Sequence, residues 1–191
     1  MAQKPRFSLV VVTSSDGFIA RTVGHAPADW QSPEEQAFFL ATVAGADWSV
    51  LGRTTHEAAF RLDRRRIVFS HSAPVPEWRS PTHLWLDPET IQPDDLAALV
   101  APVHPMRTGL ILGGAEVAAW FLERGRVDEV LLSIEPVGFE TGLPIFPGDG
   151  AGDPIELVRA RGFEVHSQCT INPAGTRLII LLPRPMTSAE R

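Results

Sequence analysis

The chain alternates between continuous apolar runs of strand length and stretches in which apolar residues have helical spacing. The runs are rich in β-branched residues, as in FSLVVV at 7–12 and GLILGG at 109–114. Such runs are typical of strands that are buried on both faces of a parallel sheet. The sequence therefore predicts strands at 7–12, 48–52, 66–70, 83–86, 109–114 and 127–136.

Helices are predicted between these strands from their start and stop signals. Ser32 is followed by a proline, and Glu35 stands three positions after Ser32, which is the pattern of a capping box. Gly45 is placed to end this helix. Asp94 is the expected cap of a second helix, over DLAALVA. Two further helices are predicted over RTTHEAAF (53–60) and AEVAAWFLERG (115–125).

The pattern changes after residue 136. A loop rich in glycine and proline surrounds GLPIF at 142–146, and two late strands are predicted at 155–166 and 177–183 with no helix between them. Strands that first alternate with helices and then follow one another predict an α/β fold. We expect a mostly parallel central sheet with helices on both faces and an antiparallel C-terminal edge.

Composition and charge limit the kind of protein. A length of 191 residues with 44% hydrophobic and 21% charged residues fits one globular domain, expected over residues 1–183 and followed by a flexible tail at 184–191. The net charge of −6 argues against a nucleic-acid partner. The single cysteine, Cys169, fits a reducing compartment, and no apolar run reaches the ~18 residues of a membrane span. We therefore expect a cytoplasmic protein without a membrane partner.

Three predicted strands end in residues suited to a phosphate-bearing ligand, and in open α/β sheets ligands bind beyond the carboxyl ends of the strands. Glycine lets backbone N–H groups approach a ligand, a helix N-terminus attracts anions, and Arg53 can contact phosphate through two hydrogen bonds. The Gly113-Gly114 pair could equally be a plain tight turn. Neither a Rossmann fingerprint nor a P-loop occurs. The three segments are LGRTT (51–55), FSHS (69–72) and LGGAEV (112–117).

The order of these motifs resembles the dihydrofolate reductase-like superfamily, and within it the pyrimidine reductases of riboflavin biosynthesis (the RibD C-terminal domain family). The resemblance implies an NADPH-binding groove and hydride transfer to a small heterocycle. It covers most of residues 7–147. The matching segments are SLVVVTSSDGFIA, WQSPEEQAFF, ADWSVLGRTTHE, RIVFSHS and LILGGAEVAAWFLERGRVDEVLLSIEPVGFETGLPIF.

The same resemblance implies roles for individual residues. Asp16, Gly17 and Ile19 follow the first strand and are expected near the nicotinamide, with Asp16 as a candidate catalytic residue. The other expected cofactor contacts lie in the three segments named above. They are Gly52, Arg53, Thr54, Thr55, Ser70, His71, Ser72, Gly113, Gly114, Ala115, Glu116 and Val117.

Glu35 has two interpretations. In dihydrofolate reductases, the helix that begins W-x-x-P-x-[DE] carries the carboxylate that holds the pterin ring, and Trp30 to Glu35 match that spacing. Glu35 would then be a catalytic residue. It could instead complete the capping box with Ser32. One carboxylate cannot fully satisfy both partners, so the two roles compete.

Two groups of polar residues, the histidines and a run of arginines, are weaker candidates for a functional site. The six histidines lack the spacing of a metal site, so no metal is expected. A run of arginines before the strand at 66–70 is more typical of a solvated surface than of a phosphate contact. These arginines are Arg61, Arg64, Arg65 and Arg66.

The implied function is NADPH-dependent reduction of a pyrimidine or pterin-like heterocycle. The first candidate substrate is 5-amino-6-(5-phosphoribosylamino)uracil, and because the sequence has no deaminase domain we expect the reduction alone. Dihydrofolate or another pterin is one alternative, which Glu35 favours, and an NADP-binding protein without turnover is another. The resemblance also suggests a homodimer, for which the apolar strand at 177–183 could provide an edge.

Overall fold

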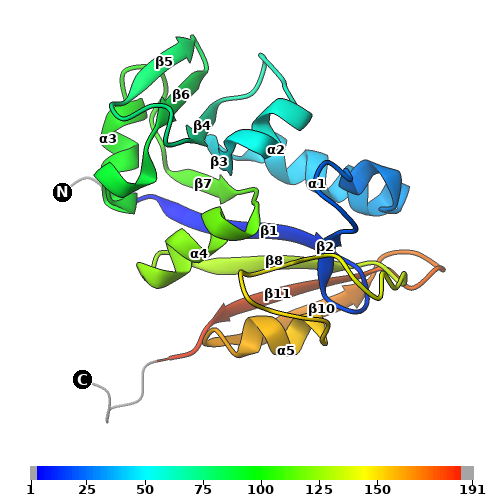
Figure 1. Cartoon of the computed structure of the whole chain (residues 1–191). Coiled ribbons are helices and arrows are strands. Elements are labelled where there is room, and N and C mark those ends of the chain that lie inside the picture. The colour runs from blue at the N-terminus through cyan, green and yellow to red at the C-terminus, as the bar shows by residue number, and fades with distance from the viewer. Residues whose placement is uncertain (1–3, 186–191) are drawn as a thin grey trace.

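The computed structural model describes residues 4–185, in which nine strands form one large sheet and two form a small one (Figure 1). The small sheet pairs β2 (Phe18–Ala20) with β9 (Leu143–Pro144). The strand order of the large sheet is β10-β11-β8-β1-β7-β3-β4-β6-β5. Its strands are β1 Arg6–Thr13, β3 Trp48–Gly52, β4 Arg66–Phe69, β5 Glu77–Ser80, β6 His83–Leu86, β7 Thr108–Ile111, β8 Glu129–Ile134, β10 Phe163–Thr170 and β11 Arg177–Pro183.

The six central strands of this sheet, from β8 to β6, are parallel to one another. Their carboxyl ends therefore all lie on the same edge of the sheet. At one side, β11 and β10 continue it antiparallel, which confirms the predicted C-terminal edge. At the other side β5 adds an antiparallel strand that the sequence did not predict, because its residues EWRS are mostly polar.

The helices cover both faces of the sheet. The main core gathers apolar residues of α3, α4 and α5, including Leu96, Phe121 and Val158, against strand residues such as Leu9 and Leu132. In contrast, the one buried residue of α1 is a glutamate, Glu35. The helices are α1 Pro33–Gly45, α2 Arg53–Ala58, α3 Leu96–Val100, α4 Ala115–Glu123 and α5 Pro154–Arg159, with short 3-10 helices η1 Pro27–Asp29, η2 Pro88–Thr90 and η3 Pro93–Asp95.

The predicted strand at 155–166 is wrong. Its first half is helix α5, and only the segment from Phe163 onward is a strand. Asp153 starts the helix, because its carboxylate accepts hydrogen bonds from the N–H groups of Ile155 (2.8 Å) and Glu156 (3.2 Å), and Pro154 occupies the first helical position.

The cap assigned to Asp94 is also wrong. Gln92 begins η3, and the carboxylate of Asp95 accepts a hydrogen bond from the Gln92 N–H at 2.8 Å, which forms a capping box. The carboxylate of Asp94 instead forms ion pairs with Lys4 (2.8 Å) and Arg126 (3.0 Å). A neighbouring residue of the same chemical type therefore takes the capping role.

The expectation that the strand at 177–183 provides a free edge is wrong, because β11 lies between β8 and β10 and the outermost strand of this antiparallel side is β10. Beyond β11, Arg184 is held in place: its N–H donates to the Gly162 carbonyl and its guanidinium to Glu164, both at 2.8 Å. The rest of the expected flexible tail, 186–191, lies outside the described residues. Within 4–185, no helix is both long and apolar enough to cross a membrane.

Candidate functional site

The segments predicted to form one groove are neighbours at the carboxyl edge of the sheet. The strands β7, β3 and β4 lie side by side, and the Gly52 N–H donates to the Gly113 carbonyl at 3.1 Å. The next strand, β6, joins them through a hydrogen bond from the Ser70 N–H to the Leu86 carbonyl at 2.9 Å. The edge thus places Gly113-Gly114, Gly52-Arg53, Ser70–Ser72 and Asp87 in this order.

The two glycines after β7 leave open space at the start of α4. Gly113 has a φ of +95°, a backbone conformation that favours glycine. Gly114, joined to it by a cis peptide bond, is the N-cap of α4 and makes no side-chain cap. A Cβ atom built on either glycine would have no described heavy atom within 4 Å. This turn therefore leaves room for an anion near the first N–H groups of α4.

The residues around this turn divide into exposed and packed groups. Arg53, Thr54 and Glu116 are exposed, and within residues 4–185 Arg53 forms no ion pair with a carboxylate. Val117 is buried in the core, where it would contact a Cβ at position 52. A cofactor contact by Val117 would thus involve its backbone alone. Ala115 and Thr55 are half-buried beside the turn.

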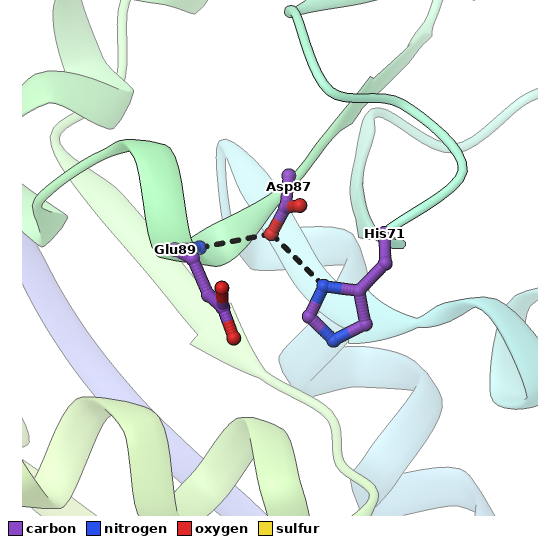
Figure 2. Close-up of side chains that lie close together, drawn as sticks. All are labelled: His71, Asp87 and Glu89. Atoms are coloured by element: carbon purple, nitrogen blue, oxygen red, sulfur yellow. Dashed lines mark hydrogen bonds and ion pairs between the residues drawn. The ribbon is translucent and has the colours of Figure 1, made fainter.

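The far end of this sheet edge carries hydroxyl groups, a histidine and two carboxylates. The hydroxyls of Ser70 and Ser72 lie 2.8 Å apart. His71 Nδ1 lies 3.1 Å from Asp87 Oδ1, which also accepts the Glu89 N–H at 3.0 Å (Figure 2). The Glu89 N–H and, after it, His71 lower the pKa of Asp87.

The side chains of His71, Asp87 and Glu89 are also of kinds that bind metal ions, and their possible ligand atoms lie within 4.8 Å of one another. Figure 2 shows that Asp87 links the other two, since the Glu89 backbone and the His71 ring both approach it. Asp87 is the N-cap of η2. Capping therefore explains why the three residues lie together, and the expectation of no metal stays a prediction.

Asp16 has a structural task in the loop after β1. Its carboxylate accepts hydrogen bonds from the Ser14 hydroxyl (2.6 Å) and from the N–H groups of Phe139 (3.0 Å) and Glu140 (2.7 Å). Burial raises its pKa, but these hydrogen bonds outweigh that effect and the pKa is lowered. Asp16 is thus an ionised anchor rather than a proton donor, and its catalytic role stays an untested prediction.

The two residues that follow Asp16 in the implied nicotinamide segment also serve the packing. Gly17 has a φ of +90°, and a Cβ there would lie 2.8 Å from the Gly152 carbonyl oxygen. Ile19 packs against the main core. Both positions are explained without a ligand, so their contacts with a cofactor stay predictions.

The structure excludes one of the two interpretations of Glu35, namely that its side chain completes the capping box. The Ser32 hydroxyl accepts the Glu35 N–H at 3.3 Å, which confirms Ser32 as the N-cap of α1. The return half of the capping box is missing. The Ser32 N–H and hydroxyl donate to Glu135 Oε1 instead, at 2.7 and 2.8 Å. The side chain of Glu35 is therefore not the cap.

Glu35 lies instead among buried polar side chains between α1 and the end of β8, a group of Glu35, Ser133 and Glu135 that we call the Glu35 pocket. It is 1% exposed, and its Oε2 atom has no hydrogen-bond partner among the described residues. Burial raises its pKa from 4.5 to about 7, and the charge of Glu135 adds to the rise, while the nearby Ser133 hydroxyl opposes it. In the described part of the chain, Ser133 Oγ makes no hydrogen bond of good geometry, and Trp30 Nε1 is also buried without a partner.

Sequence reasoning missed Ser133, Glu135 and Thr176, of which Thr176 donates its hydroxyl to Glu135 Oε2 at 2.7 Å. A signal for the first two exists, because Ser133 and Glu135 are polar residues at the end of the apolar strand EVLLSI. Thr176 carries no such signal, since it only follows the turn before β11.

The arginine run lies away from the groove. Arg66 begins β4 and therefore lies at the amino edge of the sheet, where its guanidinium donates to His56 Nδ1 at 3.3 Å. Arg61 pairs with Asp63 at 2.9 Å, and Arg65 donates to the Asp47 carbonyl at 2.7 Å. Arg61 is exposed, as the surface role predicts, whereas Arg66 is buried, so the predicted surface role is wrong for Arg66.

No protein-family model and no curated protein matches this sequence. Among solved structures, a protein from Shewanella sp. PV-4, provisionally named for riboflavin biosynthesis, is similar with a TM-score of 0.66 and 17% identity, over 94% of this chain and 99% of that one. Dihydrofolate reductase from Enterococcus faecalis, complexed with NADP(H) and RAB-propyl, has a TM-score of 0.62 and 17% identity, over 94% and 97%. The chain therefore has the dihydrofolate reductase-like fold, as its motifs predicted.

Proposed function

We propose that the protein is an NADPH-dependent reductase of a pyrimidine or pterin-like heterocycle. The observation that carries this proposal is the buried carboxyl group of Glu35, whose Oε2 atom lies near the Ser133 hydroxyl and, like that hydroxyl, has no hydrogen-bond partner within residues 4–185. A carboxyl group with a pKa of about 7 can bind the hydrogen-bonding edge of a heterocycle. It can also hold a proton at neutral pH and deliver it during reduction.

The strand ends at the carboxyl edge of the sheet carry groups that suit a dinucleotide. The accessible start of α4 at Gly114 and the exposed Arg53 suit the pyrophosphate and phosphate groups, and the hydroxyls of Ser70 and Ser72 suit the adenosine ribose side. When bound, NADPH supplies the hydride, and the chain's own residues bind and orient it. Both half-sites lie on one sheet edge, from β8 at the heterocycle to β6 at the adenosine.

Two substrate types differ in the edge that they offer to Glu35. A pterin presents two adjacent N–H donors, which an ionised carboxylate accepts. A uracil ring, as in 5-amino-6-(5-phosphoribosylamino)uracil, presents an N–H beside a carbonyl, which a protonated carboxyl matches by accepting and donating. We take the uracil substrate as the first candidate because the order of motifs favours it. Dihydrofolate or another pterin is the second candidate substrate, because the Glu35 carboxyl group is available to bind it.

The test is NADPH oxidation at 340 nm with each substrate, for the wild type and for Glu35→Gln. If the substrate is the uracil type, the glutamine amide retains one donor and one acceptor, so binding survives while turnover falls. If the substrate is a pterin, binding and turnover are both lost. In either case the variant should bind NADPH as tightly as the wild type.

The matched control is Glu34→Gln, which removes an exposed carboxylate from the same helical turn and should leave both steps unchanged. Tight NADPH binding without turnover of either substrate would contradict the proposal and favour a cofactor-binding protein that does not catalyse a reaction.

A further inference from the structure

The first turn of α1 is tied to the end of β8 by Glu135, a buried residue 103 positions from Ser32. One oxygen of Glu135 accepts both the N–H and the hydroxyl of Ser32, at 2.7 and 2.8 Å. The other oxygen accepts the hydroxyl of the fully buried Thr176 at 2.7 Å. Both oxygens of this carboxylate are therefore engaged in hydrogen bonds.

This arrangement bears directly on Glu35. In a helix with serine at the N-cap and glutamate three residues later, the glutamate side chain normally turns back to accept the N–H of the cap residue. That N–H is already taken here by Glu135. The Glu35 side chain is consequently not drawn back to the helix start, and it extends into the pocket beside Ser133.

We propose that Glu135 is a positioning residue: by capping α1 through Ser32 it keeps the Glu35 carboxyl inside the pocket, and Thr176 fixes Glu135 from the β10–β11 hairpin. The inference rests on the proposed function only for the use that is made of Glu35. The position of Glu35 itself can be measured without a substrate.

The hairpin is braced against the same helical turn by Asn172. Its Oδ1 atom accepts the N–H groups of Gly175 and Thr176, both at 3.0 Å. Its Nδ2 group donates to the Thr176 hydroxyl at 2.8 Å and to Glu34 Oε2 at 3.2 Å. The turn between the last two strands thus sets the orientation of Thr176. Because Thr176 holds Glu135 and Glu135 holds Ser32, the same turn also helps to fix the start of α1.

Glu135 acts on Glu35 in two ways, through its negative charge and through the hydrogen bonds by which it holds Ser32, and substitutions can separate these effects. Its negative charge raises the pKa of Glu35, as burial does, and among residues 4–185 no other charged group contributes to that rise. Glu34, the other acid of the turn, is exposed and contacts Asn172. A glutamine at 135 removes the charge but keeps an oxygen for Ser32, whereas alanine removes both.

The experiment is a ¹³C NMR pH titration of the full chain with side-chain-labelled glutamate, in which Glu35→Gln identifies the Glu35 signal. The wild-type midpoint is expected near 7. In Glu135→Ala, Glu35 should turn back to cap Ser32, and its midpoint should fall by about 2 units or more, as for a carboxylate that accepts backbone N–H groups. In Glu135→Gln, Glu35 should stay inside and its midpoint should fall by roughly 1 unit or less.

Glu34→Gln is the matched control: its amide oxygen can still accept the hydrogen bond from Asn172, and the titration midpoint of Glu35 should stay unchanged. A wild-type midpoint in Glu135→Ala, or equal falls in the alanine and glutamine variants, would overturn the positioning role. If Glu135→Ala does not fold, Thr176→Val decides, because it removes only the hydroxyl that fixes Glu135. The titration midpoint of Glu35 should then fall in Thr176→Val, and a midpoint equal to that of the wild type would overturn the positioning role of Glu135. Absence of reductase activity together with the expected titrations would instead refute only the proposed function.

Discussion

The carboxyl group of Glu35 is kept in the folded protein at the expense of stability. Its pKa rises from 4.5 to about 7, so between these values the folded state binds a proton that the unfolded state has released. The contribution of Glu35 to stability should therefore fall as the pH rises from about 4.5 to 7 and then stay level, whereas buried His56, whose pKa is lowered from 6.5 to about 4, contributes in the opposite direction. A group that destabilises the fold and lies in a pocket is a common feature of functional sites.

We predict that Glu35→Gln raises stability at pH 8, because the variant has no carboxylate to ionise in the pocket. The gain should be about 1–3 kcal/mol, since each pKa unit corresponds to about 1.4 kcal/mol. Urea unfolding at pH 5 and pH 8 measures it, with the exposed Glu34→Gln as control. A gain of the same size at both pH values would show that ionisation of Glu35 is not its cause.

A second residue, Arg53, should determine the preference for the phosphorylated cofactor. It is exposed at the carboxyl end of β3 and can form a forked contact with phosphate. We predict that Arg53→Ala weakens the binding of NADPH by roughly 10- to 100-fold, as expected for lost hydrogen bonds to a charged group. The binding of NADH should weaken much less. Fluorescence titration of both cofactors measures the difference. Equal losses would assign Arg53 to the pyrophosphate or to neither group.

At the scale of elements, α5 and η3 show how local signals compete. Asp153 caps α5 through two backbone N–H groups, whereas Asp94 forms only partly exposed ion pairs. We predict that Asp153→Ala lowers the unfolding free energy by about 1 kcal/mol, or roughly 2–4 °C in Tm. Asp94→Ala should lower it less, because exposed ion pairs contribute little. Thermal unfolding of both variants tests this order, and a larger loss in Asp94→Ala would contradict it.

At the scale of the whole molecule, the homodimer stays a prediction, but its expected contact changes. The strand at 177–183 is internal, so it cannot pair through its edge. An apolar hollow on the sheet is lined instead by Phe38 of α1 and by residues of β8 and β11, including Leu131, Leu178 and Ile180. We predict a dimer through this face, disrupted by Leu178→Glu. Light scattering at micromolar concentrations checks it, and a wild-type monomer would contradict the prediction.

Local sequence signals predicted most of the elements and the neighbouring strand ends at the carboxyl edge of the sheet. The cap at Ser32 and the end of α1 at Gly45 were found because such signals act over a few residues. The parallel order followed from apolar runs that alternate with helices. The prediction failed where a short helix, α5, lay inside an apolar segment with strand-like composition, and where the polar edge strand β5 lacked a pattern.

The sequence by itself determined the class of fold, the three strand ends of the groove and the two competing roles of Glu35. Only the tertiary structure excluded the capping role, because the deciding contact joins Ser32 to Glu135, 103 residues away, and a further one joins Glu135 to Thr176. A capping box is a local pattern, and the sequence spacing is the same whether or not a distant carboxylate takes the N–H. The fold brought that carboxylate to the helix start and left Glu35 in the pocket.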